Sequence, residues 1–134
     1  MKGGGLPPSV FVFFMEEKME QTMRENALGI ARLLSDGKAA DVTVLDVSEL
    51  SSWTDFFVIA TITSSAHCQG LMRQVKDYAR ENDMQIHLTN RKLPDGDDWN
   101  LIDIGPVVVH LMSKDAREFY ELEKLWHNGT VVSA

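Results

Sequence analysis

The sequence predicts a single domain of the α/β (α+β) class, in which helices pack on one mixed β-sheet of about five strands. Its 134 residues, 44% of them hydrophobic and 25% charged, suit one domain with one core. Helix-like and strand-like patterns follow one another in the order α-β-β-α-β-β-β-α, without a repeat, low-complexity segment or interdomain linker. We therefore expect one folded domain over residues 15–127, between an N-terminal extension (residues 1–14) and a C-terminal tail (residues 128–134).

The first helix is predicted over residues 15–36. Apolar side chains recur there at spacings of three and four, at Met19, Met23, Ala27, Ile30, Ala31 and Leu34. Residues 1–14 are expected to be a flexible extension. Their apolar run, Val10 to Met15, is short for a signal-peptide core, and no small-residue cleavage site follows it. Translation from Met15 or Met19 is an alternative start for the folded domain.

Three strands are predicted before the last third of the chain. Residues 42–47 are rich in valine and alternate in polarity, as a half-buried strand does. Residues 56–63 form a continuous apolar run, which is typical of a central strand covered on both faces. Residues 84–88 alternate again, and the polar segment 89–98, with its proline and glycine, is expected to be a loop.

A second helix is expected over residues 65–82, capped by Ser64 or Ser65. Its inward stripe consists of Cys68, Leu71, Val75, Tyr78 and Ala79. Cys68 is the one cysteine of the chain, so no internal disulfide can form. Its place on the stripe indicates a packed small hydrophobe rather than a nucleophile.

Residues 99–104 and 107–112 are predicted to form a hairpin around Gly105 and Pro106. Glycine can take the positive φ that a type II′ turn needs at its first position, and the second position tolerates proline. This turn sets the cross-strand pairs Asp103–Val108, Leu101–His110 and Trp99–Met112. One face of the hairpin is then wholly apolar and belongs to the core, with Ile102, Ile104, Val107, Val109 and Leu111.

The opposite hairpin face places Asp103 and His110 as diagonal neighbours, with Trp99, Leu101, Val108 and Met112 beside them. The pattern leaves two interpretations of this face open. A tryptophan and a methionine with charge around them are typical of a protein-binding surface. Alternatively, a helix covers the face, and Asp103 and His110 form a satisfied buried pair.

The end of the folded part is predicted to be a short helix from Ser113, with Phe119, Leu122 and Leu125 or Trp126 as its apolar members. From Asp95 to Trp126, eight acidic residues stand against three basic ones, in a chain of net charge −7. This charge disfavours direct, sequence-specific binding to nucleic acid and suits a basic protein partner. A solvated acidic surface is the plainer interpretation.

No pattern for catalysis, cofactor binding or metal binding stands out. His67, His87, His110 and His127 lie in four different predicted elements and lack the HxH or HExxH spacing of metal ligands. A P-loop and a GxGxxG turn are absent, and the acidic turn at 95–98 lacks the glutamate of a calcium loop. We therefore expect a cytoplasmic protein with no catalytic residue, cofactor, metal or membrane partner.

Three motifs, in order along the chain, resemble those of a known family. They are DVTVLDVSELSSWTDFFVIATITSSAHC at 41–68, WNLIDIGPVVVHLM at 99–112 and REFYELEKLW at 117–126. From about residue 19 to residue 126, the chain resembles the bacterial ribosomal silencing factors, also called Iojap-like proteins. Two positions depart from the family pattern, because Pro106 stands where an acid is common and Ile62 where glycine is usual.

The resemblance implies a fold like that of the nucleotidyltransferases, without their catalytic carboxylates. It also implies binding to the large ribosomal subunit through a basic universal ribosomal protein, the fourteenth of that subunit. There the family sterically blocks joining of the small subunit and represses translation. The partner-binding residues that the resemblance implies are Trp99, Asp103, His110, Tyr120, Glu121, Glu123, Leu125 and Trp126.

Within this implied surface, we expect Trp99 and Trp126 to be apolar anchors. The carboxylates of Asp103, Glu121 and Glu123 are expected to pair with lysine or arginine side chains of the partner. His110 is expected to orient the first of these carboxylates rather than to contact the partner.

Two other hypotheses remain. The chain can be a small nucleotidyltransferase-like enzyme, or a metal- or nucleotide-binding domain, that uses Asp46, Asp55 and Asp103. The implied surface can also serve homodimerisation of the free protein, because isologous use of one surface is common.

Overall fold

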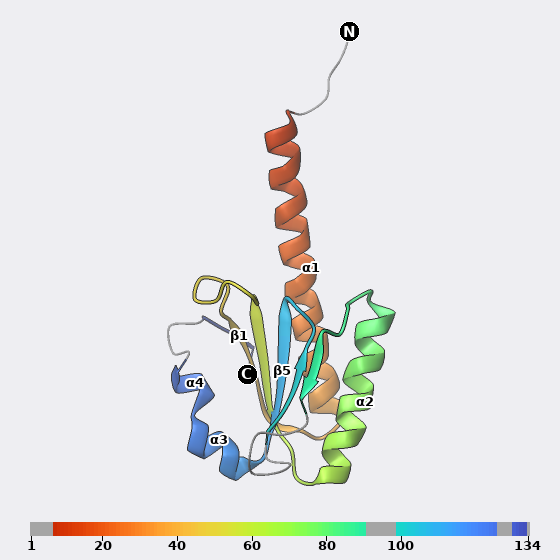
Figure 1. Ribbon diagram of the computed structural model, residues 1–134, viewed down its shortest axis with the longest axis vertical. Helices are drawn as coiled ribbons and strands as arrows, with labels where there is room; N and C mark the ends of the chain where they lie inside the picture. The colour runs from red at the N-terminus through yellow and green to blue at the C-terminus, as the bar shows by residue number, and fades with distance from the viewer. Residues whose placement is uncertain (1–6, 91–98, 126–129, 134) are drawn as a thin grey trace.

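The computed structural model describes residues 7–90, 99–125 and 130–133. Across these residues, six strands form one mixed sheet with helices on both faces (Figure 1). In their order within the sheet, the strands are β3 (Leu88–Asn90), β4 (Trp99–Asp103), β5 (Val107–Met112), β2 (Phe56–Thr61), β1 (Ala40–Asp46) and β6 (Thr130–Ser133). Strands β2 and β5 run parallel, and the other neighbouring pairs are antiparallel. The predicted fold class is confirmed, with one strand more than expected.

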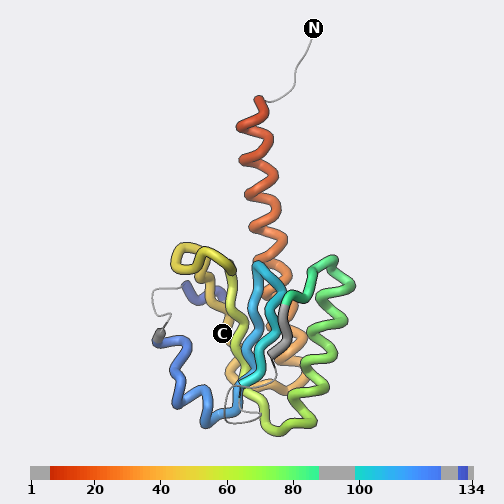
Figure 2. The backbone as a smooth tube through the Cα atoms, in the orientation of Figure 1, coloured from red at the N-terminus to blue at the C-terminus, as the bar shows by residue number. Residues whose placement is uncertain are grey.

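The helices form two layers. They are α1 (Pro8–Asp36), α2 (Ser65–Glu81), α3 (Lys114–Tyr120) and α4 (Leu122–Leu125). Helices α1 and α2 lie on one face of the sheet, and the shorter α3 and α4 lie on the other (Figure 2). In the part of the chain that the structure describes, no helix is long and apolar enough to cross a membrane.

Helix α1 begins at Pro8, so the predicted helix start at Met15 was wrong. Proline suits the first helical turn, where its missing N–H leaves no partner unsatisfied. The first half of α1 extends beyond the sheet (Figure 1) and exposes Phe11, Val12, Phe13, Phe14, Met15 and Met19. Only the second half, from Asn26 to Leu34, is buried. The predicted limits of the folded domain stay a prediction.

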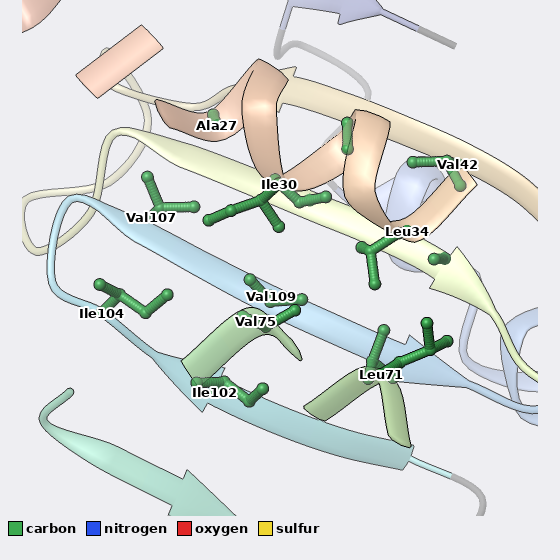
Figure 3. Close-up of a cluster of buried hydrophobic side chains, with 14 of the residues drawn as sticks. Ala27, Ile30, Leu34, Val42, Leu71, Val75, Ile102, Ile104, Val107 and Val109 are labelled. Atoms are coloured by element: carbon green, nitrogen blue, oxygen red, sulfur yellow. The ribbon is translucent and has the colours of Figure 1, made fainter. Parts of the chain in front are cut away.

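The face of the sheet under α1 and α2 holds the main hydrophobic core. In Figure 3, Ile30 of α1 and Val75 of α2 lie around Val109 of β5, and all three are fully buried. The predicted core face of the hairpin is confirmed, because Ile102, Ile104, Val107, Val109 and Leu111 all belong to this core. Cys68 is buried there as well, as its place on the inward stripe of α2 predicts.

The strand predicted over residues 84–88 was placed too early. The N–H of Met84 donates to the carbonyl of Ala79 at 2.7 Å, so it closes the end of α2 instead of joining the sheet. Pairing with β4 begins at His87, whose N–H donates to the carbonyl of Asp103 at 2.8 Å. The alternating polarity of this segment therefore has another cause. Met84 is buried and Ile86 is partly buried in an extended segment that pairs with no described strand. Residues 91–98 of the predicted loop lie outside the described residues.

The predicted C-terminal tail contains a strand. Strand β6 pairs antiparallel with β1, with Val131 opposite Leu45 and Thr130 opposite Asp46. Threonine and two valines in succession favour a strand, but three such residues after a polar segment are too few to predict one.

The predicted last helix is divided in two. Ser113 caps α3, because its Oγ accepts the N–H of Ala116 at 3.0 Å. Glu121 then takes a left-handed backbone with φ of 48°, which ends α3 before α4 begins. Of the predicted apolar members of this helix, Leu122 is buried, whereas Phe119 is 79% exposed.

Candidate docking surface

The second face of the sheet carries a smaller hydrophobic cluster under α3 and α4. Its buried members are Leu45, Val47, Phe57, Ile59, Val108, Met112, Ala116 and Leu122. Trp99, Leu101 and Tyr120 pack against this cluster and stay half-buried. Short helices therefore cover the centre of the hairpin face, as the second interpretation expects, and the rim of the face is accessible.

A series of rings crosses this face, and we call it the ring row. It consists of Trp53, Phe57, His110, Trp99, Tyr120 and Phe119, in spatial order. Successive ring centroids lie 6.3, 4.8, 5.9, 4.7 and 5.0 Å apart. The middle of the row is buried, while Trp53 and Phe119 at its ends are 57% and 79% exposed. Exposed aromatic rings on a rigid, packed base are typical of protein interfaces.

His110 pairs with Trp99 and not with Asp103, so the predicted pair was wrong. The Nε1–H of Trp99 donates to His110 Nδ1 at 3.1 Å. His110 is only 4% exposed, and burial lowers its pKa to about 4 because the charged imidazolium would lose its hydration. At neutral pH, His110 is therefore an uncharged acceptor inside the sheet face.

Asp103 lies at the tip of the hairpin, where it supports the turn. Its Oδ1 accepts the N–H of Gly105 at 2.8 Å, and Gly105 has the positive φ, 83°, that the turn prediction required. The predicted register is confirmed, with Asp103 opposite Val108 and Leu101 opposite His110. Along the strand, Asp103 is roughly 13 Å from Trp99, so the two residues mark opposite ends of the hairpin face.

The two glutamates of the implied surface have partners within the chain. Glu123 accepts from Arg117 twice, at 2.8 Å from Nη2 and at 3.1 Å from Nε. The same guanidinium donates to Thr61 and Thr43 and is only 11% exposed. Glu121 is exposed and lies 3.7 Å from Lys124. Glu123 is therefore held within the chain by Arg117, and Glu121 is the more accessible of the two glutamates.

The structure brings together Trp99, His110 and Tyr120 among the residues that the resemblance implied. Leu125 is the last residue of α4. Its side chain and the whole of Trp126 are not among the parts that the structure describes. Sequence reasoning missed Trp53 and Phe119. The sequence feature that could have indicated an exposed Trp53 is its position in a serine-rich turn between two strands, outside either strand.

Two of the three carboxylates of the enzyme hypothesis, Asp46 and Asp103, are engaged in local hydrogen bonds. Asp46 accepts from the N–H and hydroxyl of Ser48 at 3.0 and 2.6 Å, and Asp103 supports the hairpin turn. Burial, and then the charge of Asp46, raises the pKa of Asp55. Among the described residues, no group of three or more His, Cys, Asp or Glu side chains is arranged to hold a metal ion.

Other polar features also have local roles. His67 Nε2 lies 2.8 Å from the carbonyl of Gly37 and so joins the end of α1 to the start of α2, which Ser64 caps. Beside α3, an open hollow of about 360 Å³ is lined by charged residues of both signs, including Lys114, Arg117 and Glu118. Small-molecule sites are usually lined by apolar and aromatic side chains instead.

Residues 20–134 match the family model described as "Ribosomal silencing factor during starvation". The chain belongs to the RsfS family of ribosomal silencing factors. It is 40% identical over 106 residues to ribosomal silencing factor RsfS of Treponema pallidum, across 78% of this chain and 93% of that protein. It is 39% identical over 98 residues to RsfS of Bacillus subtilis, across 72% and 80% of the two chains. The resemblance drawn from the three motifs is confirmed.

The family extends beyond bacteria and includes solved structures. A mouse protein named "Mitochondrial assembly of ribosomal large subunit protein 1" is 36% identical over 101 residues, across 72% of this chain and 43% of its own length. A crystal structure from Bacillus halodurans aligns with a TM-score of 0.65 at 32% identity, across 85% of this chain and 99% of that one. One from Chromobacterium violaceum aligns with 0.68 at 28% identity, across 85% and 92%.

Proposed function

We propose that this protein is a ribosomal silencing factor that binds the large ribosomal subunit and sterically blocks association with the small subunit, which represses translation. Family membership supports the role, because the bacterial relatives are named silencing factors. The name of the mouse relative supports the large subunit as the partner. Such a protein acts in the cytoplasm, where bacterial ribosomes work.

The observation that carries the proposal is the end of the ring row that reaches the surface, with Trp99 and Tyr120 half-buried and Phe119 exposed. These rings contact one another in tilted and edge-to-face arrangements above a buried base, so they can enter a partner's pocket without first being ordered. We define the docking surface as these three rings with Asp103, Glu121, Glu123, Leu125 and Trp126. His110 is too buried to belong to it.

The partner that fits this surface is a basic protein of the large subunit, and we propose the fourteenth universal ribosomal protein. A net charge of −7 makes direct association with rRNA phosphates unfavourable and favours approach to a basic protein. We further propose that the protein acts by occupying this surface rather than by catalysis. The engagement of Asp46 and Asp103 in local hydrogen bonds supports that view.

Co-sedimentation with purified ribosomal subunits tests the proposal. We expect the protein to travel with large subunits, to be absent from small subunits, and to lower the yield of joined ribosomes. Phe119→Ala should weaken binding, whereas Phe11→Ala, which removes another exposed ring, from α1, should not. If the wild-type protein stays at the top of the gradient at low and moderate salt, also after dilution below the dissociation constant of any dimer that masks the surface, the silencing role is wrong.

A further inference from the structure

We propose that His110 is the positioning residue of the docking surface: its Nδ1 holds the indole of Trp99 in the orientation in which that ring meets the partner. The inference rests on the proposed function for its binding consequence. Its structural half, the control of Trp99 by His110, rests on geometry alone.

The protonation state of His110 follows from its partner. An indole Nε1–H can only donate, so His110 Nδ1, at 3.1 Å, must be the acceptor. The ring proton is then on Nε2. That atom is buried and finds no hydrogen-bond partner among the described residues. His110 lies opposite Ile59 on β2 and Leu101 on β4, and it makes an edge-to-face contact with Phe57, with the ring centroids 4.8 Å apart, so its neighbours there are apolar.

An imidazole is a poor choice for this position if stability is the only requirement. A buried N–H without a partner is destabilising, and an apolar ring of the same size would fill the space without that cost. The imidazole offers one thing that a phenyl ring cannot, which is an acceptor for Trp99. The buried, uncharged histidine is therefore explained by what it does to the tryptophan.

The hydrogen bond adds a directional contact to the packing of a side chain that is only half-buried. Trp99 lies at the first position of β4, and among the described residues its ring contacts are with His110 and with Tyr120, the latter at 4.7 Å. Without the bond, the indole can leave the row by rotating about its side-chain torsions. A partner would then have to order the ring on binding, which lowers affinity. With the bond, Trp99 and Tyr120 present one preformed aromatic surface.

A matched pair of substitutions separates the acceptor from the ring. His110→Phe keeps an aromatic ring, slightly larger than imidazole, and removes the acceptor, whereas His110→Asn keeps an acceptor near the position of Nδ1 and loses the ring. The first readout is the indole N–H resonance of Trp99 in the full chain, assigned by its absence in Trp99→Phe. We expect slow solvent exchange of this proton in the wild type and in His110→Asn, and fast exchange with a shifted resonance in His110→Phe.

The second readout is affinity for isolated large subunits. We expect His110→Phe to bind roughly two- to tenfold more weakly, the range for one side chain that must be ordered on binding, and His110→Asn to lose less. Unchanged affinity in a folded His110→Phe whose Trp99 resonance has moved overturns the positioning role and leaves the proposed function intact. Absence of wild-type binding overturns the proposed function and the binding consequence, while the exchange readout still tests the control of Trp99 by His110. A folded His110→Asn with fast exchange at Trp99 shows that packing, and not the acceptor, holds the indole, and it also refutes the proposal.

Discussion

The two faces of the sheet differ in how completely helices cover them. Under α1 and α2, long helices cover the sheet, and the large apolar cluster there includes the whole core face of the hairpin. Under α3 and α4, short helices cover a smaller cluster, and rings and hydrogen-bonded polar groups reach the surface. The first arrangement maximises buried apolar area, and the second gives up burial for accessible, ordered side chains. On the proposed function, stability and binding therefore depend on opposite faces of one sheet.

Adjacent phenylalanines on β2 give the largest contrast between the faces. Phe56 is in the main core and Phe57 is in the ring row, and both are almost fully buried. We expect Phe56→Ala to lower the free energy of unfolding by about 3–5 kcal/mol, since the thick core cannot collapse around the cavity. Phe57→Ala should cost less, because Trp53, 57% exposed and next to it, can move inward.

Denaturant unfolding of the two variants measures this difference. Equal losses, or a larger loss for Phe57→Ala, would mean that the ring row contributes as much to stability as the main core does. The separation of the two faces would then be wrong.

Acid should weaken the ring-row face through His110. Its pKa is about 4 in the folded chain against 6.5 unfolded, so between these values the unfolded chain binds a proton that the folded chain does not. Stability must therefore fall as the pH drops from about 6.5 to 4, by on the order of 3 kcal/mol in total, and stay level above that window. Chemical denaturation of the wild type and of His110→Phe at several pH values measures the difference.

The carboxylates titrate in both proteins, so the difference between the pH dependences of their stabilities reports His110 alone. Asp55 acts in the opposite direction, because its raised pKa makes the folded chain take up that proton first as the pH falls. If His110→Phe loses stability in acid as steeply as the wild type does, the imidazole is not the buried neutral group described above.

The hairpin shows what a sequence can determine. Gly105 and Pro106 allow few turns, a two-residue turn allows one register, and the register separates the faces, so the core residues and Asp103–Val108 pairing were predicted correctly. These steps depend on backbone geometry within a few residues. The fold class followed in the same way from the order of helical and strand periods.

The partners of individual polar groups could not be predicted in this way. His110 has Asp103 and Trp99 within diagonal reach on β4, and the choice between them depends on the rotamer of the indole and on the Gly105 N–H, which engages the carboxylate. Glu123 reaches Arg117 only because Glu121 takes a left-handed backbone, a conformation that no glycine or asparagine at that position signals.

The smallest expected effect concerns Arg117, which joins the two short helices to the sheet. Its guanidinium is mostly buried and donates to Glu123, Thr43 and Thr61, so Arg117→Ala should cost about 1–2 kcal/mol of stability. Arg117→Lys should recover little of this loss, because an ammonium group cannot reach three acceptors in the plane that a guanidinium spans.

The matched control is an exposed ion pair of the same region. Lys124→Ala removes an ion pair at 3.7 Å and should cost at most about 0.5 kcal/mol. Thermal unfolding of the three variants gives the order, and a Lys124→Ala loss as large as that of Arg117→Ala would show that general charge balance, and not this fork, holds α3 and α4 against the sheet.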